Sequence, residues 1–123
     1  MSRSISGPLA QPPPLLIGGR STRTLRVAAE HADLWNIPGD NALPDAVERS
    51  LMLNRYCTEI GRGPRTITRS IALSVSYDDP ELTRTAAGAA IQAGFTHIAL
   101  ILPTPWPPQV VHRLADTIRP LLT

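Results

Sequence analysis

The residues best suited to chemistry in this 123-residue sequence are Gly18, Gly19, Arg20, Ser21 and Thr22, which follow an apolar run and precede a helical pattern. Glycines let a backbone approach a ligand closely, and the first N–H groups of a helix are free to bind an anion. Arginine and hydroxyl side chains add further donors. The loop is therefore a candidate phosphate cradle, although it lacks the spacing of the P-loop and of the dinucleotide fingerprint. The alternative is a glycine turn in which Ser21 or Thr22 caps the helix.

Two tryptophans, Trp35 and Trp106, fall at or just after the ends of predicted strands. A flat apolar ring at such a place can pack a cofactor ring or a substrate, but tryptophan more often fills a core. Asn36 can hydrogen-bond a ligand, or it can close the turn at Pro38 and Gly39. We take Trp35, Asn36 and Trp106 as weaker candidate contacts to a substrate or cofactor ring.

The remaining chemically active residues form no catalytic constellation. The spacing of the three histidines matches neither a triad nor a metal site, so we expect each to be structural or solvated: His31, His97 and His112. Cys57 lies on the apolar face of a predicted helix and is expected to be a small core residue. The sequence therefore assigns no catalytic residue and no metal.

The elements that position the candidate loop alternate between strand and helix. Short apolar runs and period-two alternation predict strands over 15–17, 34–37, 70–77 and 97–102. Each is followed by a helical pattern, over 25–32, 44–60, 80–93 and 111–122. This order predicts an α/β fold of four βα units with parallel strands. A small open doubly wound sheet fits the pattern, and so does half of an eight-stranded TIM barrel, which typically needs about 250 residues.

Composition narrows the class of protein. A net charge of +2 with 42% hydrophobic residues suits one domain, expected over 15–123, after a flexible proline-rich lead-in over 1–14. All 12 basic residues are arginine, and they are spread among acids without a basic stripe, which argues against nucleic acid as a partner. No apolar run reaches the roughly 18 residues of a membrane span. With one cysteine and no secretory signal, a cytoplasmic location is expected.

Longer strings are more specific than this periodicity. They are Pro14-Leu15-Leu16-Ile17-Gly18-Gly19, Ala32-Asp33-Leu34-Trp35-Asn36, Glu59-Ile60-Gly61-Arg62-Gly63-Pro64 and Ala93-Gly94-Phe95-Thr96-His97. In combination they resemble the C-terminal half of luciferase-like monooxygenases, notably the deazaflavin-dependent oxidoreductases, over residues 12–122. The resemblance implies the last four βα units of an eight-stranded barrel.

The resemblance also implies a function. Gly18, Gly19, Arg20 and Ser21 would contact the phosphate end of a deazaflavin, coenzyme F-420, or alternatively of FMN. A completed barrel would then transfer hydride to a small organic substrate. Trp35 and Asn36 match a strand end near the family's site, where Leu34 replaces the usual glycine. The first four strands of the barrel have no counterpart in this sequence.

A half barrel leaves two strand edges unpaired and exposes the face that should be its interior. We expect this face to carry one of two apolar sets: Ile71, Leu73 and Val75, or Ile98, Leu100 and Leu102. The expected partner is a second copy of the chain or a separately encoded N-terminal half. The alternatives to an oxidoreductase are a non-catalytic truncated fragment or interaction module, and an open-sheet domain that binds a small phosphorylated ligand.

Overall fold

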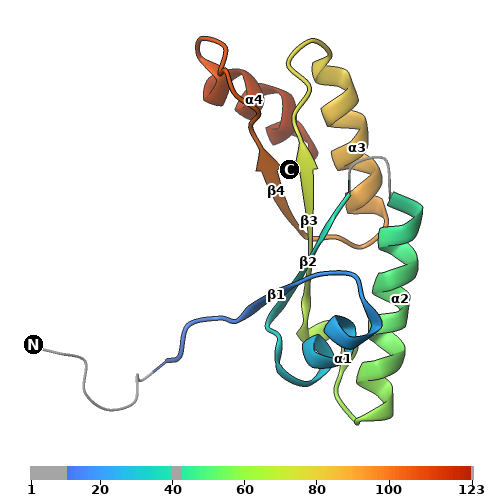
Figure 1. Cartoon of the computed structure of the whole chain (residues 1–123). Coiled ribbons are helices and arrows are strands. Elements are labelled where there is room, and N and C mark those ends of the chain that lie inside the picture. Colours follow the sequence, from blue (N-terminus) through green and yellow to red (C-terminus); the bar gives the residue numbers. More distant parts are fainter. Residues whose placement is uncertain (1–10, 40–42, 123) are drawn as a thin grey trace, which may run out of the picture.

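The computed structural model describes residues 11–39 and 43–122 as four parallel strands that alternate with helices (Figure 1). The strands are β1 (Leu16–Gly18), β2 (Leu34–Pro38), β3 (Thr68–Ser74) and β4 (His97–Ile101). The helices are α1 (Thr22–His31), α2 (Leu43–Glu59), α3 (Pro80–Gln92) and α4 (Val110–Ile118), with short 3-10 helices at Pro64–Thr66 and Arg119–Leu122. The predicted α/β class with four βα units is confirmed.

The observed bounds of the elements differ from the predicted ones by at most four residues, and β3 and α4 are two of the larger differences. β3 begins two residues before 70 and ends at Ser74, after which the Ser76 N–H donates to Thr83 Oγ1 of α3, at 3.0 Å, as the chain turns toward that helix. α4 ends at Ile118, and the last residues tighten into a 3-10 turn that contains Pro120.

Part of the expected lead-in lies outside the described residues. Residues 1–10 belong to that part, and residues 11–14 are exposed and in neither helix nor strand. Among the described helices, none combines the length and the apolar character that crossing a bilayer requires.

The winding of the sheet decides between the two predicted architectures. The strands lie in the order β1-β2-β3-β4, so each crossover moves one strand further in the same direction. Right-handed crossovers of this kind place every helix on the same face of the sheet, whereas a doubly wound sheet needs a reversal of strand order. The open doubly wound alternative is therefore wrong. The winding is that of consecutive βα units in a barrel.

The two faces of the sheet differ in character. The side chains beneath the helices are large, apolar and buried, and they include Trp35, Ile37, Ile71 and Leu73 at 0–3% exposure. The alternate positions face the side without helices and carry mostly small or polar residues: Gly18, Asn36, Ser70, Ala72 and Ala99, with Leu16 and Ile101 near the two edges. We call this second side the open face.

The expectation that Ile71, Leu73 and Val75 cover the open face is wrong. They lie under the helices, at 0%, 3% and 6% exposure. Ile98 and Leu100 of β4 also pack against the helix-side core. A period of two separates the faces of a strand but does not say which one the helices cover, and the helices take the face that buries more apolar area.

Candidate functional site

The candidate loop lies at the carboxyl end of β1, where ligands bind in parallel α/β sheets. Gly19 has φ +140°, and a Cβ at this position would come within 2.9 Å of Thr24 Cγ2. Its N–H donates to Asn36 O at 3.1 Å, which joins the loop to the end of β2. Gly18 is less crowded, since an added Cβ would meet only Asn36 O, at 3.7 Å. Gly19 therefore shapes the turn, whereas Gly18 leaves its backbone accessible.

Ser21 begins the helix that follows the loop. Its Oγ accepts a hydrogen bond from Thr24 N at 3.1 Å and donates to Thr24 Oγ1 at 2.9 Å. The predicted role of Ser21 as an N-cap is thus confirmed. The first turn of α1 carries no acidic residue, so the positive end of the helix dipole at the loop is not neutralised by a side chain of its own helix.

Arg20 is exposed and forms an ion pair with Asp45, in the first turn of α2. The hydrogen bond from Arg20 is the largest cause that holds the pKa of the Asp45 carboxyl below its ordinary value, with smaller contributions from the Arg20 and Arg49 charges. The guanidinium is therefore held beside the loop by the neighbouring βα unit, where a bound phosphate would lie within its reach.

The ion pair yields a first prediction. Replacing Arg20 by alanine removes the hydrogen bond and its charge, so we expect the pKa of Asp45 to rise toward 3.8. A carboxylate with a lowered pKa stabilises the folded state above its unfolded-state pKa and loses that contribution as the pH falls through the folded-state value. The difference in stability between wild type and variant should therefore diminish below pH 3.8.

An NMR titration of the Asp45 carboxyl carbon measures this pKa directly. Arg49→Ala is the control, because the Arg49 Nε contact to Asp45 Oδ1, at 3.4 Å, is the weaker of the two and should move the pKa less. An unchanged Asp45 pKa in Arg20→Ala would contradict the pairing.

The two tryptophans lie in different environments. Trp35 is fully buried, donates from Nε1 to Gly19 O at 2.8 Å, and packs against Phe95 with ring centroids 6.4 Å apart. Its expected contact with a ligand ring is not supported, since no part of the indole is exposed. Trp106 is 64% exposed in the loop after β4, where Nε1 donates to Leu102 O at 3.1 Å. β1 and β4 are the opposite edges of the sheet, so within one chain Trp106 does not join the loop at Gly18.

Asn36 belongs to a row of residues that crosses the sheet on the open face. Strand register places Gly18, Asn36, Ser70 and His97 side by side on β1, β2, β3 and β4. Asn36 Nδ2 donates to Ser70 Oγ at 2.7 Å, and Ser70 Oγ lies 2.8 Å from His97 Nδ1. The side chain of Asn36 thus bonds across the sheet and does not close the turn at Pro38 and Gly39. We call these four residues the polar row.

The hydrogen bonds of the polar row connect three strands through Ser70. Its oxygen accepts from the Asn36 amide, and the direction of its bond with His97 Nδ1 depends on the imidazole tautomer. His97 is exposed whereas Ser70 is 1% exposed, which makes the imidazole and not the hydroxyl the accessible group. Sequence spacing concealed this link, because Ser70 and His97 are 27 residues apart.

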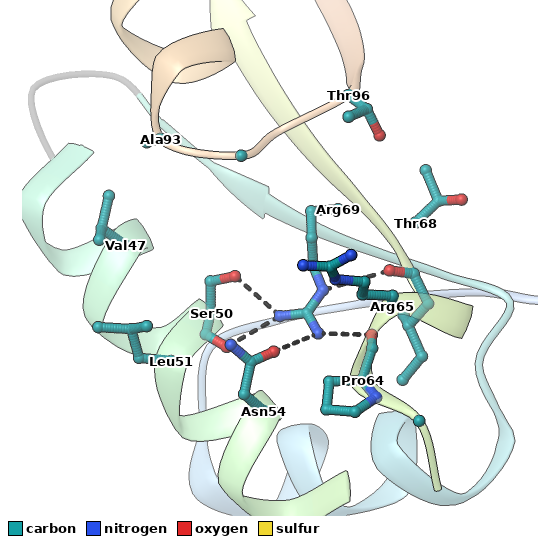
Figure 2. A pocket seen from close by; sticks show the side chains of 13 residues that line it. Val47, Ser50, Leu51, Asn54, Pro64, Arg65, Thr68, Arg69, Ala93 and Thr96 are labelled. Atoms are coloured by element: carbon teal, nitrogen blue, oxygen red, sulfur yellow. Dashed lines mark hydrogen bonds between the residues drawn. The ribbon is translucent and has the colours of Figure 1, made fainter.

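A cleft of about 760 Å³ opens at the start of β3, between α2 and the loops that precede β3 and β4 (Figure 2). Arg69 lies in it with all five N–H groups engaged: Nε donates to Ile67 O, and the terminal nitrogens donate to Ser50 O, Ser50 Oγ, Asn54 Oδ1 and Pro64 O at 2.7–3.2 Å. Burial lowers the pKa of this guanidinium, which has no carboxylate partner among the described residues. With every donor used, Arg69 joins structural elements and is not free for a ligand.

Arg62 has a similar structural role. Its terminal nitrogens donate to the carbonyls of Ala28, Ala29 and Ala32 at the end of α1, at 2.6–3.5 Å. The last carbonyls of a helix have no N–H partner within the helix, so Arg62 supplies donors to some of them, and its positive charge also complements the helix dipole. Sequence patterns predict neither role, because Arg62 binds carbonyls of α1 and Arg69 binds Ser50, each 19 or more residues away.

No grouping of three or more His, Cys, Asp or Glu side chains suited to a metal ion occurs in the described ranges. Cys57 is buried, as predicted, and burial raises the pKa of its thiol. Comparison with known proteins finds no matching family model. No curated protein matches the sequence either.

Proposed function

We propose that the chain binds the phosphate end of a flavin-type cofactor, coenzyme F-420 or FMN, as part of a luciferase-like oxidoreductase. The observation that carries the proposal is the convergence of three features at the carboxyl end of β1: an accessible backbone at Gly18, the uncompensated N-terminus of α1, and the Arg20 guanidinium. Each favours an anion, and their combination suits a phosphate monoester or diester.

The residues around this loop fit such a group. Gly19 holds the turn open in a conformation that other residues rarely adopt, and Ser21 orders the first turn of α1. Next to the loop, Asn36 lies on the open face with polar neighbours, where a ring attached to the phosphate would rest. Arg20 exchanges its contact with Asp45 for one with the phosphate, or shares the two.

A bound flavin or deazaflavin supplies the hydride chemistry, and the chain supplies binding and orientation. The proposed roles of its residues are to fix the phosphate at Gly18–Ser21 and to offer hydrogen bonds from the polar row. A hydride acceptor or donor would be a small organic molecule on the open face.

Fluorescence titration with FMN and with coenzyme F-420 tests the proposal, and Gly18→Val is the sharpest variant. A side chain at Gly18 has room in the folded chain but would occupy the space the phosphate needs. We expect binding to weaken by at least ~10-fold, the equivalent of about 1.4 kcal/mol, with little change in thermal stability. Arg20→Ala should weaken binding by a similar factor through loss of a charge-assisted hydrogen bond.

Arg65→Ala is the matched control, because Arg65 is exposed and lines the cleft at the start of β3, away from the loop at Gly18. The affinity of this variant for either cofactor should equal that of the wild type. Binding of neither cofactor would refute the proposal and favour a non-catalytic fragment or interaction module. If inorganic phosphate binds as tightly as either cofactor, the ring contributes nothing to the affinity, and the result would favour a site for small phosphorylated ligands.

A further inference from the structure

The sheet ends in two strands that have a neighbour on one side only. On β1, Leu15 O accepts from Asp33 N and Leu34 N, and Gly19 N donates to β2, so alternation directs the N–H and C=O groups of Leu16 and Gly18 outward. On β4, Ile101 O accepts from Val75 N at 2.9 Å, which directs Ile98 and Leu100 outward in the same way. In the described part of the chain no strand pairs with either outer edge.

α4 is covered by fewer strands than the other helices. In a singly wound sheet each helix packs over the strand before it and the strand after it. α1, α2 and α3 each have two such strands, whereas α4 follows the last one. The apolar side chains here are consequently uncovered: Val111 on α4 is 66% exposed, Leu122 in the 3-10 helix that follows is 67% exposed, and only Ile118 is buried on α4.

A hollow of about 360 Å³ lies where a further strand could pack beneath α4. It is lined on the β4 side by Leu100 and Leu102 and on the α4 side by Val111, Leu114, Ile118 and Leu122. At the other end of the sheet, β1 offers a partly exposed Ile17 on its helix side, beside Leu15 and Leu16 at 48% and 54% exposure. One edge therefore presents an apolar hollow, and the other presents an apolar strand of the kind that would fill it.

We propose that a second copy of this chain closes the sheet, with β1 of each copy paired in parallel to β4 of the other. A two-fold axis along the barrel makes the two junctions identical and yields eight parallel strands, the number in a TIM barrel. Each β1 then lies beneath the α4 of the partner copy, and no strand edge is left over.

The surface available is of the size that a specific interface needs. Leu15, Leu16, Ile101, Val111 and Leu122 are each about half to two-thirds exposed along the two edges. Burying an aliphatic side chain completely removes roughly 60–120 Å² from water. If these residues and Trp106 were buried in both copies, the side-chain area removed from water would be on the order of 1,000 Å², without counting the backbone. At each junction the outward backbone groups of Leu16 and Gly18 on β1 would also pair with those of Ile98 and Leu100 on β4 of the other copy.

The closed barrel also accounts for the polar row. Enclosing polar side chains is costly unless they are hydrogen-bonded, and Asn36, Ser70 and His97 already bond to one another within one copy. In the two-fold assembly both rows lie in the interior. The pairing does not depend on the proposed cofactor, so it can succeed or fail separately from the proposed function.

Sedimentation velocity and native mass spectrometry of the full chain test the pairing. The wild type should have twice the 13.3 kDa mass of one chain at micromolar concentration. Leu16→Asp on β1 places a carboxylate inside the closed barrel, and Val111→Asp on α4 places one above the β1 of the partner copy, so each should weaken the dimer by at least ~100-fold. Leu51→Asp is the control: Leu51 is 58% exposed on α2, which is not at either edge, and the variant should remain dimeric.

Hydrogen exchange identifies the strands that pair. The amides of Leu16, Gly18, Ile98 and Leu100 should exchange slowly in the wild type and quickly in Val111→Asp, while buried β3 amides stay protected in both, which shows that the variant is folded. A wild-type monomer would overturn the proposal, as would a dimer sensitive at Val111 but not at Leu16, or an assembly whose mass keeps rising with concentration. If the chain is monomeric alone and assembles only with a different protein, the edges of β1 and β4 bind that protein and the proposal of a second copy is overturned.

Discussion

Trp35→Ala should destabilise the fold by about 3–5 kcal/mol, the cost of removing a large buried aromatic side chain. Trp35 is fully buried between β2 and the helices, and it packs against Phe95. Its Nε1 also holds Gly19 O, so the substitution releases the carbonyl of the candidate loop. Chemical denaturation followed by circular dichroism measures the change in free energy of unfolding.

Trp106→Ala is the matched control, since it removes the same side chain from an exposed position. Its effect on the stability of one chain should stay below about 1 kcal/mol. Trp35→Phe keeps the ring packing and loses the hydrogen bond, so it should fall between the two. Equal effects of Trp35→Ala and Trp106→Ala would contradict the core position of Trp35.

Arg69→Met is expected to destabilise the fold by about 2–4 kcal/mol, although Arg69 touches no ligand site. The guanidinium satisfies carbonyls of Ser50, Pro64 and Ile67, which would be left without that partner in a partly buried position. Methionine restores the apolar part of the side chain and avoids the cost of burying a charge, so the remaining loss reports the hydrogen bonds. Thermal and urea unfolding measure it.

Arg65→Met provides the comparison for Arg69. The two arginines line the same cleft (Figure 2), but Arg65 is exposed. Its substitution should change stability by less than about 0.5 kcal/mol. If both variants lose the same amount, the stabilisation comes from net charge and not from the network around Arg69.

The order and type of the elements could be predicted because they depend on local patterns. Gly18 and Gly19 after an apolar run predict the end of β1 to within a residue, and the predicted cap Ser21 accepts a hydrogen bond from Thr24 N. α2 ends at Glu59, one residue before the predicted end of its helical pattern at 60. Periodicity, turns and caps are interactions between near neighbours, so a single sequence contains them.

The contents of the two sheet faces could not be predicted in the same way. Ile71 and Leu73 alternate with Ala72 and Ser74, which identifies two faces, but the helices alone decide which face is covered. The roles of Trp35 and Asn36 followed from that choice: neighbours in sequence, they point to opposite sides of the sheet, one into the core and the other into the polar row.

Four βα units and a glycine-rich loop at the end of the first strand can be predicted from the sequence alone, because both arise from residues close together along the chain. The single direction of winding of the sheet, the contact of Asn36 and His97 with Ser70, and the bonds of Arg62 and Arg69 to distant backbone carbonyls are seen only in the folded chain. The physical reason is that strand order and side-chain contacts across strands are set by burial and hydrogen bonding between segments 20 to 35 residues apart, as the 27-residue separation of Ser70 and His97 shows.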